Sequence, residues 1–469
     1  GLRKEMIFVP GQYWGNGRED ELKSLNENLP SSTSMTLTGG KIWGEVSESF
    51  LSTLKNNLSA GGKTYRPVSL WINWPVTDNS KQHLILGGGE KFLHPNVDPS
   101  LLSGIMLNPM QQSEPSKIAL FSGAQYSWKQ WKSEEEAKKI NDIAFNFVEN
   151  GHFEDSKVSA AFRELGKHMI NQNMDNRVVK LEESVDLAPK LTDFMTKLKA
   201  GQDVTAERAA LRAEFAKIKD AAELYKASGD KKMVAQIHYW LDNAIDQMNA
   251  LDAFLTGTEA MATNDAAKLW DSYYKGLKLY EQSQTHTFHY VDHMEKAELG
   301  VQHIRPFILS LKEVLASEVQ KVLHPDQIIS TFITNRTGVE GGLAEVTDGD
   351  LATHAIIKSP NSIKTGDYIG MKFNKPIAIQ TLTFAMGTQA NPRDTFSKAE
   401  VQYQDENDNW VTLKEPSYVG NESLLKFENL NIKAKAVRMI ATADRENTWF
   451  AVQEIAVNRP VEKARSQQA

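Results

Sequence analysis

The first 131 residues alternate short apolar runs with amphipathic stretches. Val46, Phe50 and Leu54 recur at helical spacing between two of the apolar runs, within Glu45–Leu58. A repeat of strand and helix predicts a parallel sheet, and polar residues after each strand are typical of a (β/α)₈ barrel. The four runs that predict strands are Met6–Val9, Met35–Leu37, Val68–Ile72 and Gly104–Leu107. We therefore predict that residues 1–131 form the C-terminal half of such a barrel, strands 5–8.

Residues 132–323 have a helical pattern. Apolar residues return every three or four positions, with alanine and charged residues between them. The pattern predicts a bundle of about five or six helices. It is clearest at Leu211, Phe215, Ile218, Ala222 and Tyr225, and in the stretches Met233–Leu255, Asp265–Tyr280 and Gly300–Leu323.

Residues 324–459 change to short alternating strands separated by polar turns, such as the run from Asp405 to Asn409. This pattern predicts a β-sandwich, and residues 460–469 are polar, like a linker or tail. The predicted fold class is thus multidomain: half a (β/α)₈ barrel, a helical bundle and a sandwich. The predicted strands of the sandwich are Tyr368–Phe373, Thr381–Phe384, Ala399–Tyr403, Trp410–Leu413, Ala436–Ala441 and Ala451–Val457.

Composition narrows the function classes. The chain has 469 residues, of which 41% are hydrophobic and 24% charged, as in ordinary globular proteins. A net charge of −7 argues against nucleic-acid binding, which needs a basic surface. The absence of cysteine excludes disulfides and thiol catalysis. No apolar run approaches the roughly 18 residues of a membrane span.

Both ends of the sequence are interpreted as cuts through a longer protein. Gly1 leads within a few residues into an apolar run without a signal peptide, and the polar tail follows the last strand. Half a parallel sheet has exposed edges and is not expected to be stable alone. We expect four further strands to precede Gly1 or to come from another chain.

Polar and aromatic side chains follow the predicted strands. The run Leu70–Asp78 begins as a strand and ends in Asn, Trp, Pro and Asp, and another strand ends at Asn108. Sugars need paired donors and acceptors for their hydroxyls and aromatic faces for their C–H groups, which such residues supply. The alternative is that each polar residue only caps a strand or a helix. The candidate sugar-binding residues are Tyr13, Trp71, Asn73, Asp78 and Asn108.

The same segments resemble glycoside hydrolase family 84, the β-N-acetylglucosaminidases that include O-GlcNAcases and bacterial enzymes named hyaluronidases. The resemblance is carried by the runs Phe8–Tyr13, Leu70–Asp78, Asn108–Ala119 and Tyr126–Trp128. It implies that Tyr13 lies near the acetamido or anomeric region and that Trp71 walls the acetamido pocket. Asn73 would support the intermediate, Asp78 would accept from O4 and O6, and Asn108 would bind the O3/O4 side.

In that family catalysis is retaining and substrate-assisted. The acetamido oxygen attacks the anomeric carbon and forms an oxazoline, while two adjacent aspartates polarise the acetamido group and act as general acid and base. The sequence contains no Asp-Asp pair, so we expect no catalytic residue in this chain and a dyad upstream of Gly1. The adjacent acids Glu154–Asp155 and Asp20–Glu21 lie in polar segments and are interpreted as solvated.

The C-terminal strands resemble a family 32 carbohydrate-binding module of the discoidin type. The resemblance implies a structural calcium ion, for which Asp348, Asp350, Thr353 and Glu454 supply oxygen ligands. The alternative is an Asx turn without an ion. No cofactor is expected for catalysis. Candidate sugar contacts on the loops are His354, Asn391, Arg393, Trp449 and Phe450; the runs that carry the resemblance include Glu345–Thr353, Val401–Gln404 and Trp410–Leu413.

The leading hypothesis is a secreted or cell-surface bacterial β-N-acetylglucosaminidase that acts on glycans or glycoproteins bearing terminal β-GlcNAc. It would be active only with the N-terminal half of the same enzyme. Three alternatives stay open: a glycan-binding protein that does not cleave, a glucosaminidase directed at hyaluronan, and a scaffold whose helical bundle docks a partner protein.

Overall fold

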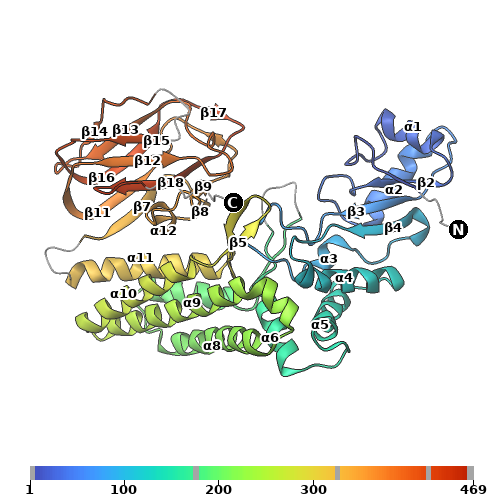
Figure 1. Ribbon diagram of the computed structural model, residues 1–469, viewed down its shortest axis with the longest axis horizontal. Helices are drawn as coiled ribbons and strands as arrows, with labels where there is room; N and C mark the ends of the chain where they lie inside the picture. The colour runs from blue at the N-terminus through green and yellow to red at the C-terminus, as the bar shows by residue number, and fades with distance from the viewer. Residues whose placement is uncertain (1–5, 173–178, 323–327, 419–423, 462–469) are drawn as a thin grey trace. The chain divides into compact units, whose positions relative to one another are not determined.

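The computed structural model describes residues 6–172, 179–322, 328–418 and 424–461. The chain divides into two compact units, Gly1–Leu315 and Ala316–Ala469. Each unit is described by itself below (Figure 1).

The first unit begins with a four-stranded parallel sheet in the order β1-β2-β3-β4. Strand β3 is buried except at Trp71, because its apolar side chains pack under the helices that follow each strand. The elements are β1 (Met6–Phe8), α1 (Asp20–Asn28), β2 (Thr33–Leu37), α2 (Glu48–Leu58), β3 (Val68–Ile72), α3 (Gly89–Phe92), a 3₁₀ turn (Pro99–Leu101), β4 (Leu102–Leu107) and α4 (Ser113–Trp128). The mixed α/β class is confirmed.

This sheet is open, with β1 and β4 as its edge strands. The β1 edge is apolar and exposed: Met6 has 66% of its surface accessible, and Ile7 and Phe8 are exposed as well. Helix α4, which follows the other edge, exposes Leu120, Ala124 and Trp128 at intervals of four residues, and Trp128 is 90% accessible. Such apolar surfaces normally have a partner. The half-barrel itself remains a prediction.

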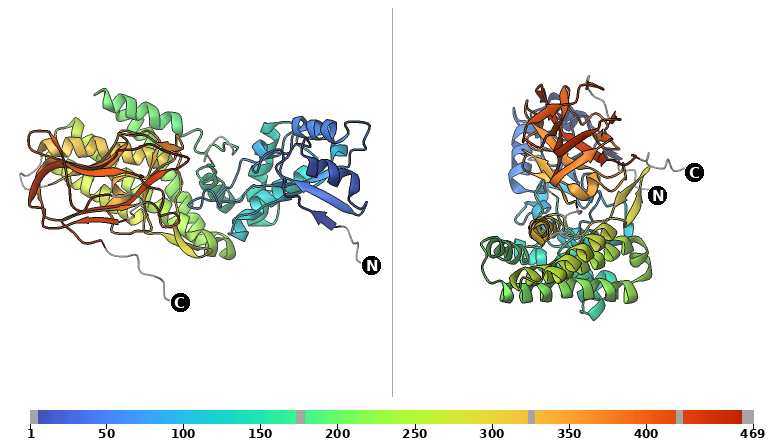
Figure 2. Two further views of the ribbon diagram at one scale, coloured as in Figure 1. Left: turned by 90° about the horizontal axis from the view of Figure 1, so that it is seen from above. Right: turned by 90° about the vertical axis from the view of Figure 1, so that its left-hand side faces the viewer.

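A helical region follows, as the sequence predicts. Its long helices α8, α9 and α10 pack side by side, and Gly257 of α9 lets Leu315 of α11 approach closely (Figure 1; Figure 2). The helices are α5 (Glu134–Asn150), α6 (Lys157–Gly166), α7 (Ala188–Lys199), α8 (Thr205–Ser228), α9 (Lys231–Ala262), α10 (Ala266–Ser283) and α11 (Ile304–Val322). None of the helices in the described ranges has both the length and the apolarity needed to cross a membrane.

A β-hairpin within this helical region is absent from the sequence prediction. It consists of β5 (Thr287–Tyr290) and β6 (His293–Lys296), paired antiparallel. The alternation of Phe288 and Tyr290 with polar residues indicates a strand. A run of only four residues between two long helices is too short to distinguish a strand from a helix end.

A buried carboxylate connects the helical elements. Glu183 is fully buried and accepts backbone N–H groups from Ile170, Asn171 and Gln302, at 3.1, 3.1 and 2.8 Å. It therefore joins the chain after α6 to the loop before α11. Burial raises the pKa of Glu183 to about 7, although the three backbone N–H donors act in the opposite direction.

The raised pKa of Glu183 predicts how the stability of the protein changes with pH. The folded protein keeps the Glu183 proton up to about pH 7, whereas the unfolded chain releases it near 4.5. Between these values the folded state binds more protons, so stability falls as pH rises, by roughly 2–3 kcal/mol for this group. Urea unfolding of the wild type and of Glu183→Gln at pH 5 and pH 8 measures this. An identical pH dependence in both proteins contradicts it.

The second unit is a β-sandwich, as predicted. Its two five-stranded antiparallel sheets run β14-β13-β16-β11-β7 and β15-β12-β18-β9-β8, around a core that includes Phe384, Phe396 and Phe450. The strands are β7 (Ser330–Thr334), β8 (Val339–Glu340), β9 (Ala355–Ile357), β11 (Tyr368–Ile379), β12 (Leu382–Met386), β13 (Ala399–Gln404), β14 (Trp410–Thr412), β15 (Leu424–Phe427), β16 (Ile432–Ala441) and β18 (Phe450–Val457). A short pair, β10 (Ser362–Ile363) and β17 (Arg445–Glu446), and helix α12 (Leu343–Val346) complete it.

Candidate functional site

The side-chain amide of Asn73 connects three strand ends. Its Oδ1 accepts from Trp71 Nε1 at 2.9 Å and from Asn108 Nδ2 at 3.0 Å, while its Nδ2 donates to the Ile42 carbonyl at 2.6 Å. Trp71 lies in β3, Asn108 follows β4, and Ile42 belongs to the loop after β2. The carboxyl ends of parallel strands share one edge of the sheet, which is why these residues meet.

The backbone between β3 and β4 supports this arrangement. Asn108 N donates to the Ile72 carbonyl, and Val76 N donates back to the Asn108 carbonyl, both at 2.9 Å. The fully buried Trp74 indole donates to the Gly87 carbonyl at 2.9 Å. The loop that carries Asp78 is thus fixed at its base, and the Asp78 side chain is exposed.

Tyr13 lies on the loop after β1. Its carbonyl accepts from Thr38 N at 2.9 Å, which joins this loop to the end of β2, and its ring is half-buried edge-on to Trp14 at 5.0 Å. The structure therefore places all five predicted residues on loops or strand ends at one edge of the sheet. Direct hydrogen bonds connect Trp71, Asn73 and Asn108.

The β5–β6 hairpin contributes residues that the sequence analysis did not identify. Both polar atoms of the Gln111 side-chain amide bond to the hairpin backbone. Nε2 donates to the His289 carbonyl at 2.7 Å, and Oε1 accepts from Val291 N at 3.1 Å. The Lys81 ammonium lies 5.5 Å from the centre of the Tyr290 ring. Burial raises the pKa of Tyr290, and the negative charge of Asp78 raises it further.

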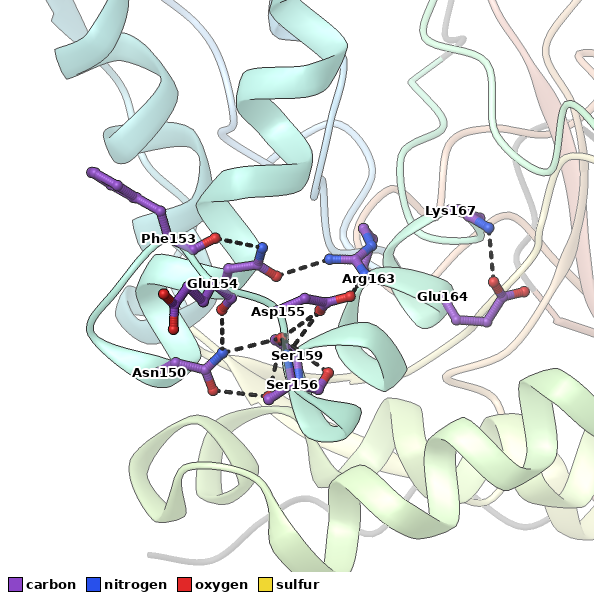
Figure 3. Close-up of polar contacts among 10 residues, drawn as sticks. Asn150, Phe153, Glu154, Asp155, Ser156, Ser159, Arg163, Glu164 and Lys167 are labelled. Carbon is purple, nitrogen blue, oxygen red and sulfur yellow. Dashed lines mark hydrogen bonds and ion pairs between the residues drawn. The ribbon is translucent and has the colours of Figure 1, made fainter.

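One acid of each adjacent pair has structural partners. Asp155 accepts from Ser156 N, from Ser159 Oγ and from Arg163 at 2.9–3.0 Å around the start of α6 (Figure 3). The hydrogen bond from Arg163 lowers the pKa of Asp155. Glu21 accepts the N–H groups of Gly11 and Gln12, both at 2.8 Å. These contacts are those of carboxylates that stabilise backbone and helix ends.

The sandwich brings oxygen atoms together around Thr353. Its Oγ1 lies 2.8 Å from Asp348 Oδ2, 2.9 Å from the Asp350 carbonyl and 3.0 Å from the Glu345 carbonyl. One hydroxyl proton can fully serve only one of these acceptors, so three oxygen atoms share a single donor. The Asp350 carboxylate instead accepts from Ala352 N at 2.8 Å.

Glu454 lies beside this cluster. It is fully buried, accepts from Gly349 N at 3.1 Å and forms an ion pair with Arg459. Burial raises the pKa of Glu454, and the charge of Asp348 contributes to this rise. Within the described ranges, no three His, Asp or Glu side chains gather as a metal site.

The candidate sugar contacts of the sandwich require one correction. Phe450 is fully buried in the core, so the prediction of Phe450 as a candidate sugar contact is wrong. It is the first residue of β18, and its side chain packs in the core between the sheets with those of Val452 and Ile455. Trp449 and His354 are half-buried, with the Lys358 ammonium 5.5 Å from the Trp449 ring, and Asn391 and Arg393 are exposed.

Three segments match known families in chain order. Residues 2–166 match the family model described as beta-N-acetylglucosaminidase. The chain is similar to the family 84 glycoside hydrolases. Residues 186–287 match a hyaluronidase post-catalytic domain-like model, and residues 330–455 match the F5/8 type C domain. The family resemblance predicted from the sequence is confirmed.

Solved structures agree with these matches. CpGH84D has 25% sequence identity and a TM-score of 0.59, over 67% of this chain and 50% of that one. CpGH84B has 22% identity and a TM-score of 0.53, over 66% and 51%. A Thermobaculum terrenum O-GlcNAc hydrolase mutant has 19% identity and a TM-score of 0.51, over 67% and 62%. The last two matches concern the fold alone. The chain spans about half the length of the first two structures.

We predict that Asn73→Ala weakens the strand-end site. The change removes the acceptor for both Trp71 and Asn108, and the free energy of unfolding should fall by about 1–2 kcal/mol because the site is partly solvated. Trp71 should also lose order, which indole NMR signals would show. Asn79→Ala, further along the same loop, is the matched control. Equal effects of the two substitutions would contradict the role of Asn73.

Proposed function

We propose that the chain is part of a retaining β-N-acetylglucosaminidase that removes terminal β-linked N-acetylglucosamine. The single observation that carries the proposal is the hydrogen-bonded set of Trp71, Asn73 and Asn108 at the carboxyl edge of the sheet. That edge is where (β/α)₈ barrels hold their active sites. The family match over residues 2–166 supports the same reaction class.

The proposed roles follow the family resemblance, residue by residue. Trp71 forms the wall of the acetamido pocket, and Tyr13 lies beside the acetamido or anomeric region. Asn73 supports the oxazoline intermediate. Asp78, whose carboxylate is exposed, accepts from the O4 and O6 hydroxyls, and Asn108 contacts the O3/O4 side. A carboxylate that accepts two hydroxyls can hold one sugar in one orientation.

The catalytic dyad is proposed to come from outside these residues. The sequence holds no adjacent aspartates, and the carboxylates of Asp155 and Glu21 are engaged by backbone and helix ends. The exposed apolar edge at β1 and the exposed residues Leu120 and Trp128 on α4 are where the rest of a barrel would pack. In this proposal residues 1–131 are the half-barrel, 132–323 the helical domain and 324–459 the sandwich.

Turnover of an aryl β-N-acetylglucosaminide tests the reaction. We expect none from the chain alone. Turnover should require a companion N-terminal half-barrel, produced together with this chain, in which one strand ends in two adjacent aspartates. An active preparation of the chain alone overturns the proposed division of the site. If the chain binds the sugar but no companion half-barrel gives turnover, a glycan-binding protein that does not cleave its ligand would be favoured.

The role of Asp78 gives a sharper prediction. In the completed enzyme Asp78→Ala should lower kcat/KM by roughly 100-fold or more, since two hydrogen bonds to a charged acceptor are lost. Asp20→Ala, an exposed carboxylate in the first turn of α1, is the matched control and should change little. A near-normal kcat/KM in Asp78→Ala would contradict the proposal that Asp78 binds the O4 and O6 hydroxyls.

The sandwich is proposed to hold a structural calcium ion and to bind glycans outside the cell or on its surface. Thr353 Oγ1, the Asp348 carboxylate and the carbonyls of Asp350 and Glu345 would be ligands, with Glu454 beside them. The F5/8 type C match over residues 330–455 supports a binding module.

Calcium should therefore stabilise this unit. We expect Ca²⁺ to raise the Tm of the sandwich transition and EDTA to reverse it, because an ion that binds only the folded state adds stability by mass action. Thr353→Val keeps the side-chain shape and removes the hydroxyl, so it should abolish the shift. Thr388→Val, also buried in this unit, is the control. No shift in the wild type would favour the Asx turn without an ion.

A further inference from the structure

The tip of the β5–β6 hairpin has an unfavourable backbone conformation. Val291 has φ of +52° and 72% of its surface exposed. β-Branched residues rarely adopt positive φ, because their side chains collide with the backbone. In the described parts of the chain, the other non-glycine residues with positive φ are Asn, Asp and Ser. Valine here costs stability that glycine or asparagine would not.

The tip is held by side chains from the two loops that carry Asp78 and Asn108. Gln111, three residues after Asn108, binds the backbone on both sides of Tyr290 through the His289 carbonyl and Val291 N. Lys81, three residues after Asp78, lies over the Tyr290 ring. The hairpin therefore contacts both loops that carry the proposed O3, O4 and O6 contacts.

Strain at an exposed position next to a ligand site points to a role for the side chain. The exposed isopropyl group of Val291 does not stabilise the folded protein, because apolar surface that stays in water contributes no burial energy. The charged groups around the tip are Lys81, Asp292, His293 and Glu295, and His293 is hydrogen-bonded to Asp292 at 2.9 Å and to Glu295 at 2.6 Å. Val291 is the apolar element among them.

We propose that Val291 forms a wall of the sugar site on its O4/O6 side and excludes glycans extended there. This inference rests on the proposed function, because it takes Asp78 as the group that binds O4 and O6. A fixed tip with a branched side chain has little freedom to move aside. A free hydroxyl fits beside it, and a further sugar attached to O4 does not. The helical region would thus restrict the site to terminal residues.

The test compares two sugars on the full chain. Calorimetric titration with methyl β-N-acetylglucosaminide and with the same glycoside carrying galactose on O4 gives a ratio of affinities. We expect the wild type to prefer the unsubstituted sugar by roughly tenfold or more. Val291→Gly should narrow that ratio severalfold, chiefly by raising the affinity for the sugar that carries galactose on O4. Glycine accepts the positive φ, so the variant should fold and even gain stability.

A second variant and a control complete the design. Lys81→Ala removes the cation over Tyr290 and should narrow the ratio in the same direction by loosening the tip. Val185→Gly changes another exposed valine in the loop before α7 and should leave the ratio as it is. If neither Val291→Gly nor Lys81→Ala changes the ratio of the two affinities, the inference about Val291 is wrong but the proposed sugar site stands. The same holds if the wild type binds the two sugars equally well. Binding of neither sugar overturns the proposed sugar site itself and the inference with it.

Discussion

The side chain of Asn73 is the constraint on which the strand-end site depends. A parallel sheet brings its carboxyl ends to one edge but does not fix the side chains there. Asn73 does this with one amide, whose oxygen accepts from Trp71 and Asn108 while its nitrogen donates to the Ile42 carbonyl. Three loops far apart in sequence thereby share one geometry. Aspartate could not replace it, because it lacks the donor.

Much of the sheet that carries these residues could be predicted from the sequence. Strand β3 occupies the predicted residues Val68–Ile72, because a run of buried apolar residues ending in polar ones defines both the strand and its exit. Strand β4 begins two residues earlier than predicted, at Leu102, and β1 ends one residue earlier, at Phe8. The helices from α8 to α10 followed from their periodicity.

Other features could not be predicted from the sequence, because they depend on contacts between residues far apart in the chain or on strand register. Gln111 meets His289 across 178 positions of sequence, so no local signal connects them. Phe450 was expected on a loop, and only the register of β18 against β9 shows that its ring faces the core. Glu183 resembles any exposed glutamate in the sequence, and one of its three backbone donors, Gln302 N, lies 119 positions away.

The contact between Gln111 and the hairpin has a consequence for where this protein can be divided. The family match that covers the strand ends stops at residue 166, and the hairpin begins at Thr287. A fragment cut at the end of that match would retain all five residues of the proposed sugar site. It would nevertheless lose the hairpin that contacts the loops after β3 and β4, so the boundary of the family match is not the boundary of the structure that supports these loops.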